Sequence, residues 1–337
     1  MLKLDSAPKR LIASSGAPNY GQFDEIPRDL ALEDFDYRTV MDAQASKFAR
    51  YFDYKQFQFV SIVTQDYLIG VAIADIRYLT SAFCYLYDRR KKQLVEENWL
   101  RPLAWDSHSA PSPYNSTTHI ARKQIQFHIV DGVWRAQLAT RQLSADLTLM
   151  PEHGSQALAM CTPTGYQGWT YTQKHNALRV TGRLSVAGKT LDLSGACAGY
   201  DFSAGYMRRE TSWRWASINC RDQFGTLGLN LAAGVNETGS CENVLWINGQ
   251  KHGLPPVYFS FSRADSAKPW HIYSQNGQVD LTFTAENCRR EKLNLYWLKS
   301  NFRQFIGHFN GAITDNHGVV HKISATLGMT EDHFARW

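Results

Sequence analysis

Closely spaced cysteines are absent from this sequence. The six cysteines stand far apart, with no Cys-x-x-Cys pair, and this spacing disfavours zinc clusters, redox-active thiol pairs and a framework of disulfides. Glycine-rich phosphate loops and the G-x-S-x-G motif are also missing. His317 and His321 are four residues apart, but HGVVH contains a turn glycine, and a turn does not bring two imidazoles together as a helix does. We therefore expect neither a metal ion nor a cofactor.

A strong charge of one sign and long apolar runs are missing as well. The 36 Lys and Arg residues stand against 31 Asp and Glu, a net charge of +5, and no basic stripe predicts a nucleic-acid partner. The N-terminal residues lack the apolar stretch of a signal peptide. The most apolar region, residues 67–87, is interrupted by Asp75 and Arg77 and is too broken to span a bilayer. We expect a soluble, cytoplasmic protein with no integral membrane segment, for which transient membrane contact stays an open alternative.

Aromatic residues, by contrast, are abundant at 13% of the chain, and flat rings pack well on pleated sheets. From about residue 55 the chain consists of short apolar or alternating runs, such as QFQFVSIV (56–63) and PVYFSFSR (256–263), separated by Gly, Asn, Asp and Pro. Such runs are typical of an antiparallel all-β protein. Residues 1–50 differ, because prolines precede a helix-like patch that begins at residue 29. We expect an irregular or helical N-terminal arm there.

Segments of the chain repeat in the same order in two halves. The matched pairs are FVSIVTQD (59–66) with WASINCRD (215–222), DLTLMPE (146–152) with DLTFTAE (280–286), and GRLS (182–185), LDLSGA (191–196) and Asp201 with GAIT (311–314), HKISAT (321–326) and Glu331. This order predicts a tandem duplication, with an arm at 1–50, a first unit at 51–205 and a second unit at 206–337.

Each unit has a size at which short antiparallel strands can close into a barrel, which removes exposed sheet edges. An eight-stranded barrel has an interior wide enough for side chains or for one small ligand. The offset between matched segments shrinks after the first pair, so the first unit must hold extra residues. The segment 102–124, rich in Ser, Pro, Thr and His, is the predicted insertion.

The stretch GYDFSAGYMRRETSWRWAS (199–217) crowds charged and aromatic residues at the junction of the two units. In a strand, Trp213 and Trp215 share one face and Arg214 lies on the other. The matched positions Phe57 and Phe59 are aromatic as well. This pattern predicts a structural role for these rings, closing one end of each barrel.

Asp201 follows an apolar strand and precedes a glycine-hinged turn. One interpretation pairs Asp201 and Glu210 with the arginines at 208, 209 and 214, so that the ion pairs fix the junction. The other interpretation puts Asp201 in an aromatic-lined site, as a proton donor or as an anchor for the polar end of a ligand. The sequence leaves both open.

The stretch 199–217 and the C-terminal segment resemble an uncharacterised bacterial family of unknown function. That segment is FRQFIGHFNGAITDNHGVVHKISATLGMTEDHFARW (302–337), and the resemblance covers most of the chain from about residue 23. The chain is more distantly similar, mainly through D-x-x-x-G at Asp201–Gly205, to the lipocalin-like superfamily of carotenoid hydratases, AttH, pericyclases and a yeast survival factor. This resemblance implies two tandem calycin-type barrels with a hydrophobic pocket. In the hydratases the matching acidic residue stands between two histidines, whereas Asp201 stands between Tyr200 and Phe202.

We therefore predict an all-β protein of two tandem lipocalin-like antiparallel β-barrels that binds a hydrophobic or amphipathic small molecule of lipid, fatty-acid or isoprenoid type. One alternative is a hydratase, isomerase or cyclase that uses Asp201 as its acid, and another is an interaction module without a ligand. The candidate ligand-binding residues are Tyr166, Trp169, Tyr206, Arg209, Trp213, Arg214 and Trp215.

Overall fold

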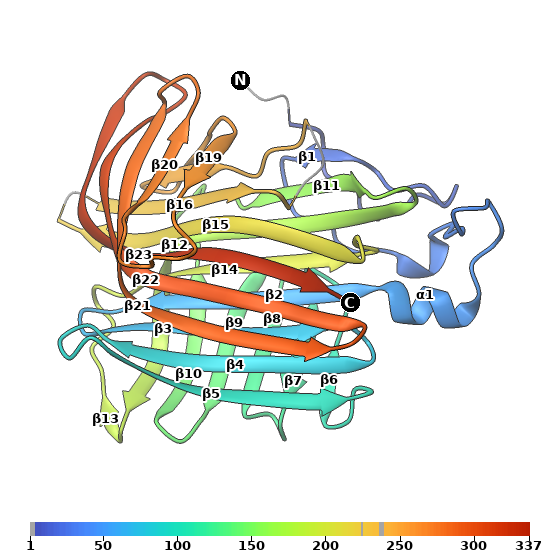
Figure 1. Cartoon of the computed structure of the whole chain (residues 1–337), viewed down its shortest axis with the longest axis horizontal. Coiled ribbons are helices and arrows are strands. Elements are labelled where there is room, and N and C mark those ends of the chain that lie inside the picture. Colours follow the sequence, from blue (N-terminus) through green and yellow to red (C-terminus); the bar gives the residue numbers. More distant parts are fainter. Residues whose placement is uncertain (1–3, 224, 236–238) are drawn as a thin grey trace.

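The computed structural model describes residues 4–223, 225–235 and 239–337, which form two curled antiparallel β-sheets (Figure 1). The strands of the first sheet are β1 (Gly21–Phe23), β2 (Lys55–Val63), β3 (Tyr67–Asp75), β4 (Leu79–Asp88), β5 (Gln93–Pro102), β6 (Ser107–Ser109), β7 (Ser116–Ile120), β8 (Ile125–Val130), β9 (Val133–Ala139), β10 (Leu143–Met150), β11 (Leu158–Thr164), β12 (Gly168–Val186), β13 (Lys189–Thr190) and β14 (Cys197–Gly205). Those of the second sheet are β15 (Glu210–Asp222), β16 (Gly225–Ala233), β17 (Val244–Ile247), β18 (Gln250–Gly253), β19 (Val257–Ser260), β20 (Trp270–Ser274), β21 (Val279–Leu295), β22 (Leu298–Thr314) and β23 (Val320–Arg336). The predicted all-β fold of two tandem lipocalin-like barrels is confirmed.

The N-terminal arm is mostly irregular and packs on the first sheet. It contains the 3-10 helix η1 (Leu32–Asp34), the helix α1 (Lys47–Asp53) and β1, which pairs with β11. The helix-like patch is thus helical only in two short pieces. Between them the backbone N–H of Met41 donates to the Thr39 hydroxyl at 3.3 Å. Such local side-chain bonds compete with helical ones.

The two sheets share one order of strands. The path β5-β4-β3-β2-β14-β12-β10-β9-β8 of the first sheet corresponds to the path β18-β17-β16-β15-β23-β22-β21-β20-β19 of the second. The matched sequence segments lie on corresponding strands: β2 with β15, β10 with β21, and β12 with β22. Beyond β8 the first sheet adds β7 and β6, and both lie in the predicted insertion.

A pair of glycines shows how closely the two sheets correspond. Gly182 in β12 opposes Leu147 in β10, and Gly311 in β22 opposes Leu281 in β21. The φ angles of the glycines are 118° and 134°. A Cβ atom at either position would lie 2.1 Å from a backbone oxygen of the neighbouring strand. Both copies of the unit therefore require glycine at the same place.

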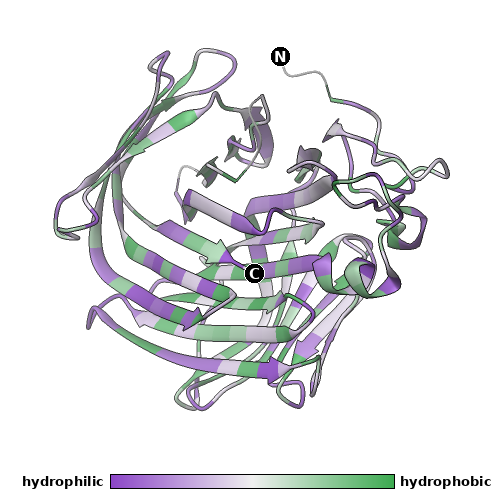
Figure 2. Ribbon diagram, turned by 45° about the vertical axis from the view of Figure 1, so that its right-hand side comes forward, coloured by the Kyte–Doolittle hydropathy of each residue, from purple (hydrophilic) through white to green (hydrophobic). Residues whose placement is uncertain are grey.

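Alternate residues of β2 and β15 face different cores. Figure 2, coloured by hydropathy, shows hydrophobic and hydrophilic residues interspersed along the strands of both sheets. Val60 belongs to the interior core of the first barrel and Ile218 to that of the second. Phe59 and Trp215 belong to a third cluster, which lies between the outer faces of the two barrels and which we call the seam. The seam cluster consists of Phe59, Leu68, Ala72, Tyr85, Tyr87, Trp215, Ile306, Leu327 and Met329. The prediction that the Phe and Trp rings close the barrel ends is wrong.

The chain passes from the first sheet to the second between Gly205, where β14 ends, and Glu210, where β15 begins. We propose that the two barrel domains divide here, as 51–205 and 206–337.

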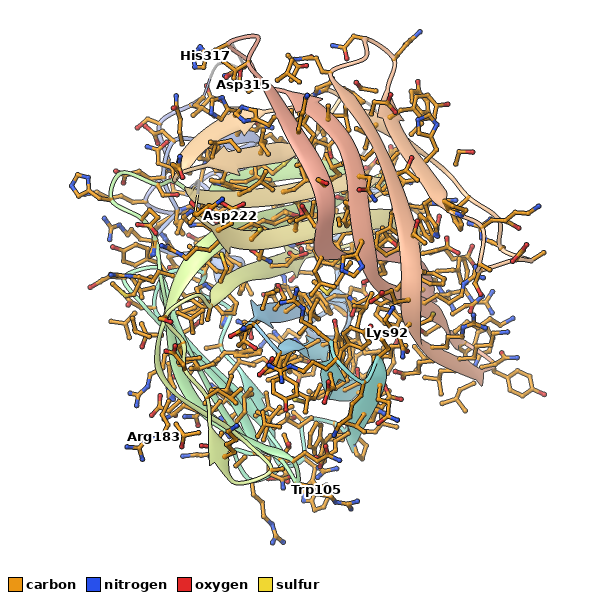
Figure 3. All side chains as sticks on the ribbon, turned by 90° about the vertical axis from the view of Figure 1, so that its left-hand side faces the viewer. Lys92, Trp105, Arg183, Asp222, Asp315 and His317 are labelled. Atoms are coloured by element: carbon orange, nitrogen blue, oxygen red, sulfur yellow. The ribbon has the colours of Figure 1, made fainter. Side chains whose placement is uncertain are left out.

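Polar contacts between the barrels add to the seam. The Tyr87 hydroxyl donates to Glu286 at 2.8 Å, and Nζ of Lys92 (Figure 3) lies 2.7 Å from the same carboxylate.

Candidate functional site

A buried group of charged side chains lies at the seam. Lys174 in β12 faces Asp201 in β14 and forms an ion pair with it. Nζ of Lys174 also lies 3.5 Å from Oε1 of Glu242, in the connection before β17. Lys174 and Glu242 are both buried. Burial lowers the pKa of Lys174, but the two carboxylates outweigh it and raise that pKa above its ordinary value, so the ammonium group stays charged.

Glu331 in β23 is the counterpart of Asp201 in the second barrel. It stands opposite Gln304 in its sheet, as Asp201 stands opposite Lys174. Its oxygens accept hydrogen bonds from Nε1 of Trp213 at 2.6 Å and from Nε2 of Gln304 at 3.0 Å. Burial, with the nearby charge of Asp201, raises the pKa of Glu331 to about 7 despite these donors.

Two of the candidate aromatic residues complete this group. Trp213 bonds Glu331, and Nε1 of Trp215 donates to Oδ1 of Asn230 at 2.7 Å. Nζ of Lys174 lies 5.9 Å from the centre of the Trp215 ring, within the range of a cation–π contact. The structure therefore brings Asp201 and Trp215 to Lys174, whereas Trp213 contacts Glu331.

One interpretation of the sequence paired Asp201 with arginines. The structure corrects it, because the partner of Asp201 is Lys174. Glu210 pairs instead with Arg336, at 3.2 Å. Sequence reasoning missed Lys174 and Glu242. A signal for Lys174 does exist: it is the one Lys, Arg, Asp or Glu in the run GWTYTQKH (168–175), where a lone charge favours a buried ion pair.

A β-bulge next to this group anchors the first barrel in the second sheet. The register of β12 against β14 shifts at residues 176–177. There Nδ2 of Asn176 donates to the Ser217 hydroxyl at 2.7 Å, and to the carbonyls of Ile218 and Leu229 at 3.1 and 3.0 Å. The seam is thus held by apolar, ionic and hydrogen-bonded contacts.

Arg214 lies on the other face of β15, away from the seam. It opposes Asp332 in β23, and this buried carboxylate meets three guanidinium groups. Arg263 donates two hydrogen bonds to it at 3.0 and 2.9 Å, Arg303 donates another, and Nε of Arg214 lies 3.7 Å from it. Burial raises the pKa of Asp332, but Arg263 and Arg303 outweigh it and lower that pKa.

A depression of about 420 Å³ opens beside these arginines. It is lined by Arg214, Ala233, Val257, Tyr258, Phe259, Ser260, Phe261 and Arg263. The Phe261 ring stacks on Trp270, with 3.8 Å between ring centres, and Trp270 belongs to the core of the second barrel. Guanidinium groups therefore border an aromatic wall, a combination suited to an amphipathic anion.

Tyr206 and Trp169 pack with the arm and not with Asp201. The Phe35 ring lies 4.9 Å from the Tyr206 ring and 6.0 Å from the Trp169 ring. The Tyr206 hydroxyl donates to the carbonyl of Arg50 at 3.1 Å. These contacts give both rings a role in fixing the arm.

Tyr166 and Arg209 are exposed. Together with Tyr206 they line a second depression, of about 480 Å³, between the arm and the turn that joins β11 to β12. The candidate residues thus divide among three places: the seam, the arginine cluster and this depression by the arm.

Histidines gather at the turn between β22 and β23, where Figure 3 labels Asp315 and His317. Nε2 of His321 lies 2.9 Å from Asp315, and the rings of His252 and His317 are 5.5 Å apart. Among the described residues, however, no three His, Cys, Asp or Glu side chains are arranged to hold a metal ion. All six cysteines are free thiols.

The model of DUF2804, a domain of unknown function, matches residues 28–337. The chain belongs to the DUF2804 family. This DUF2804 chain is also similar to a solved structure described as a putative AttH from Nitrosomonas europaea, with 14% sequence identity and a TM-score of 0.50 over 82% of this chain and 91% of that chain. At this identity the likeness concerns the fold, and it agrees with the predicted resemblance to the lipocalin-like superfamily.

A comparison with curated proteins found no match. Within the described part of the DUF2804 chain, none of the helices has the length and apolar character needed to cross a membrane.

Proposed function

We propose that this protein binds a small amphipathic molecule with an anionic end, in the depression beside Arg214. The observation that carries the proposal is the ratio of charges at Asp332, where one carboxylate meets three guanidinium groups. One negative charge balances only one of the three cations. A carboxylate or phosphate group on a ligand would balance another, and such groups match the donor geometry of arginine.

Arg214 is the arginine best suited to meet the ligand. Arg263 and Arg303 both donate hydrogen bonds to Asp332. Arg214 approaches that carboxylate only to 3.7 Å, beyond hydrogen-bond distance, and it lines the depression. Its donors can therefore turn to a ligand without breaking the bonds that hold Asp332.

The apolar part of the ligand would lie against the aromatic wall. Phe259 and Phe261 supply that wall, with Val257 beside them, and the stacking of Phe261 on Trp270 makes it rigid. A volume of about 420 Å³ falls within the range of roughly 300–1,000 Å³ that small-molecule sites occupy.

Two other locations are less suitable. In the interior of the first barrel the fully buried Trp134 stacks on Tyr200, with 4.6 Å between ring centres, so side chains occupy that core. At the seam, Lys174 already pairs with Asp201. Lys174 also lies 3.5 Å from Glu242 of the second barrel. These contacts favour a structural role for Asp201 at the seam, as in an interaction module, over a role as the acid of an enzyme.

The test compares two ligands that differ in charge. Displacement of a fluorescent fatty acid measures the affinities for oleate and for oleyl alcohol. Arg214→Gln should weaken oleate binding by about tenfold or more, because it removes a charge-assisted hydrogen bond, and should leave oleyl alcohol binding unchanged.

Arg183→Gln is the matched control, since Arg183 is an exposed arginine of the first barrel (Figure 3). It should bind both ligands as the unaltered protein does. The proposal fails if neither ligand binds, or if Arg214→Gln and Arg183→Gln bind oleate with equal affinity.

A further inference from the structure

The helix α1 presents aromatic side chains to solvent. None of its seven residues, all of them described, is buried. The side chain of Phe48 is 71% exposed, and Tyr51 lies one turn further along the same face. Val40 and Met41, in the loop before the helix, are also exposed, Met41 to 83%. A surface helix of a folded domain normally buries its apolar face, and this one does not.

A second exposed apolar group lies at the turn between β21 and β22. These strands form a long hairpin of 17 residues each, and its turn carries Leu295, Tyr296 and Trp297. Tyr296 is 87% exposed and Trp297 75% exposed. Single exposed apolar residues are common, but two adjacent aromatic residues at the tip of a hairpin are not.

The two groups are neighbours. The guanidinium of Arg209 lies 5.9 Å from the centre of the Trp297 ring. The same Arg209 lines a depression together with Val40 and Ala49 of the arm. Figure 1 shows α1 and the β21–β22 turn at the same end of the molecule.

A third group of this kind follows β5. Leu103 and Trp105 are exposed, and Trp105 lies at the lower margin of the molecule in Figure 3. The backbone N–H of Leu103 donates to the carbonyl of Tyr78 at 3.1 Å, and the guanidinium of the adjacent Arg77 lies 5.2 Å from the centre of the Tyr51 ring. This group therefore connects to α1.

The segments around these groups are rich in basic residues. They are residues 38–53, 99–106, 121–124, 206–210 and 290–300. They contain 11 Lys and Arg against 5 Asp and Glu, and subtracting these from the 36 and 31 of the whole chain leaves 25 against 26. These segments therefore carry an excess of positive charge, and Asp36, which precedes the first of them, pairs with Arg38 at 2.8 Å.

We propose that this end of the protein docks on an anionic membrane surface. Tyr and Trp side chains favour the boundary between lipid headgroups and acyl chains, and each Lys or Arg near an anionic bilayer adds to the attraction. The apolar groups stand on separate turns with charged residues between them. A protein partner requires one continuous packed patch, whereas separate protruding groups suit the soft surface of a bilayer.

The test is flotation of the full-length protein with vesicles of phosphatidylcholine and phosphatidylglycerol. The protein should float with these vesicles, and less with vesicles of phosphatidylcholine alone or at high salt, because salt screens the attraction. The double variant Tyr296→Ser/Trp297→Ser should lose binding by at least about tenfold. Its circular dichroism should be unchanged, since neither side chain is buried.

The matched control is Val319→Ser/Val320→Ser, two exposed apolar residues at the turn between β22 and β23. This control should bind vesicles as the unaltered protein does, and so should Arg183→Gln, which alters an exposed arginine outside the proposed surface. The proposal is overturned if the protein does not float with anionic vesicles, which is the result for a surface that binds a protein. Equal binding by the two double variants also overturns it.

Discussion

At the scale of single residues, Lys174 is the cation that both Asp201 and Glu242 contact at the seam. Lys174→Met would leave two carboxylates in a buried site without that cation. We expect the free energy of unfolding to fall by about 3–5 kcal/mol, measured by urea denaturation. Lys189→Met, which alters an exposed lysine on β13, should change it by no more than about 0.5 kcal/mol.

Because Lys174→Met also alters packing, a second replacement separates charge from volume. Adding Asp201→Asn should recover part of the lost stability, since it removes one of the two carboxylates that contact Lys174. If the double variant is as unstable as the sum of the two single variants, the ion pair is not what stabilises this site.

Glu331 should make stability depend on pH. Its pKa is about 7 in the fold against 4.5 in an exposed carboxyl, so between these values the folded state keeps a proton that the unfolded state has lost. The stabilisation that protonated Glu331 gives the fold is therefore fully present below pH 4.5 and is lost as the pH rises to 7. The free energy of unfolding falls by about 3 kcal/mol over this range. We compare the free energy of unfolding of Glu331→Gln with that of the unaltered protein. As the pH rises from 4.5 to 7, the difference, variant minus unaltered protein, should increase by about 3 kcal/mol.

Two buried histidines also make stability depend on pH, so the effect of Glu331 is measured as the difference between Glu331→Gln and the unaltered protein. Burial lowers the pKa of His175 and of His333 to about 3. Their unfolded forms take up protons below pH 6.5, so stability falls as the pH drops from 6.5 towards 3. The effect of His175 is common to both proteins and cancels in the difference. Nδ1 of His333 lies 3.8 Å from Glu331, so both proteins are compared with His333 replaced by Gln. A difference that does not change between pH 4.5 and 7 would contradict the titration of Glu331.

At the scale of strands, the glycine pair allows a direct test of the correspondence between the sheets. Gly182→Ala and Gly311→Ala should each lower the free energy of unfolding by at least about 2 kcal/mol, because each adds a left-handed φ penalty and a clash with backbone. Gly318→Ala should cost only about 1 kcal/mol, since its φ is 84° but its Cβ would have no atom within 4 Å. Equal losses at positions 311 and 318 would argue against the close backbone contact.

Most of the strands could be predicted from alternation, because each strand has one face on a core and its residues record that contrast. The exceptions have physical causes. The bulge of the long strand β12 could not be predicted, since the bonds that hold Asn176 come from β15 and β16 of the other barrel and leave no local pattern. The helix-like patch of the arm was overestimated, because polar side chains such as Thr39 bond the local backbone instead.

At the scale of the whole molecule, the seam should couple the two barrels during unfolding. The seam cluster is buried, and Asn176 bonds both β15 and β16. Separating the barrels would expose that apolar surface to water. We therefore expect one unfolding transition in urea, with coincident curves from tryptophan fluorescence and far-ultraviolet circular dichroism. Two separate transitions would mean that each barrel is stable without the other.

The sequence grouped its candidate residues by proximity along the chain, and the fold separates them. Alternation along β15 turns Arg214 away from Trp213 and Trp215. The partners of Arg214 could not be found from sequence, because Arg263, Arg303 and Asp332 come from a loop and two other strands. Lys174 and Glu242 were missed for a similar reason, since only the folded chain brings Lys174 to Asp201 and to Glu242.

The equivalence of Asp201 and Glu331 constrains how such a protein could be assembled from halves. A protein with two copies of the second half would bring two glutamates together at its centre, each opposite a glutamine, with no lysine between them. A protein with two copies of the first half would carry a lysine opposite each aspartate. The first half thus has a lysine, Lys174, at the position where the second half has a glutamine, Gln304. This difference makes the two halves chemically unequal, so that a first half pairs with a second half and not with a copy of itself.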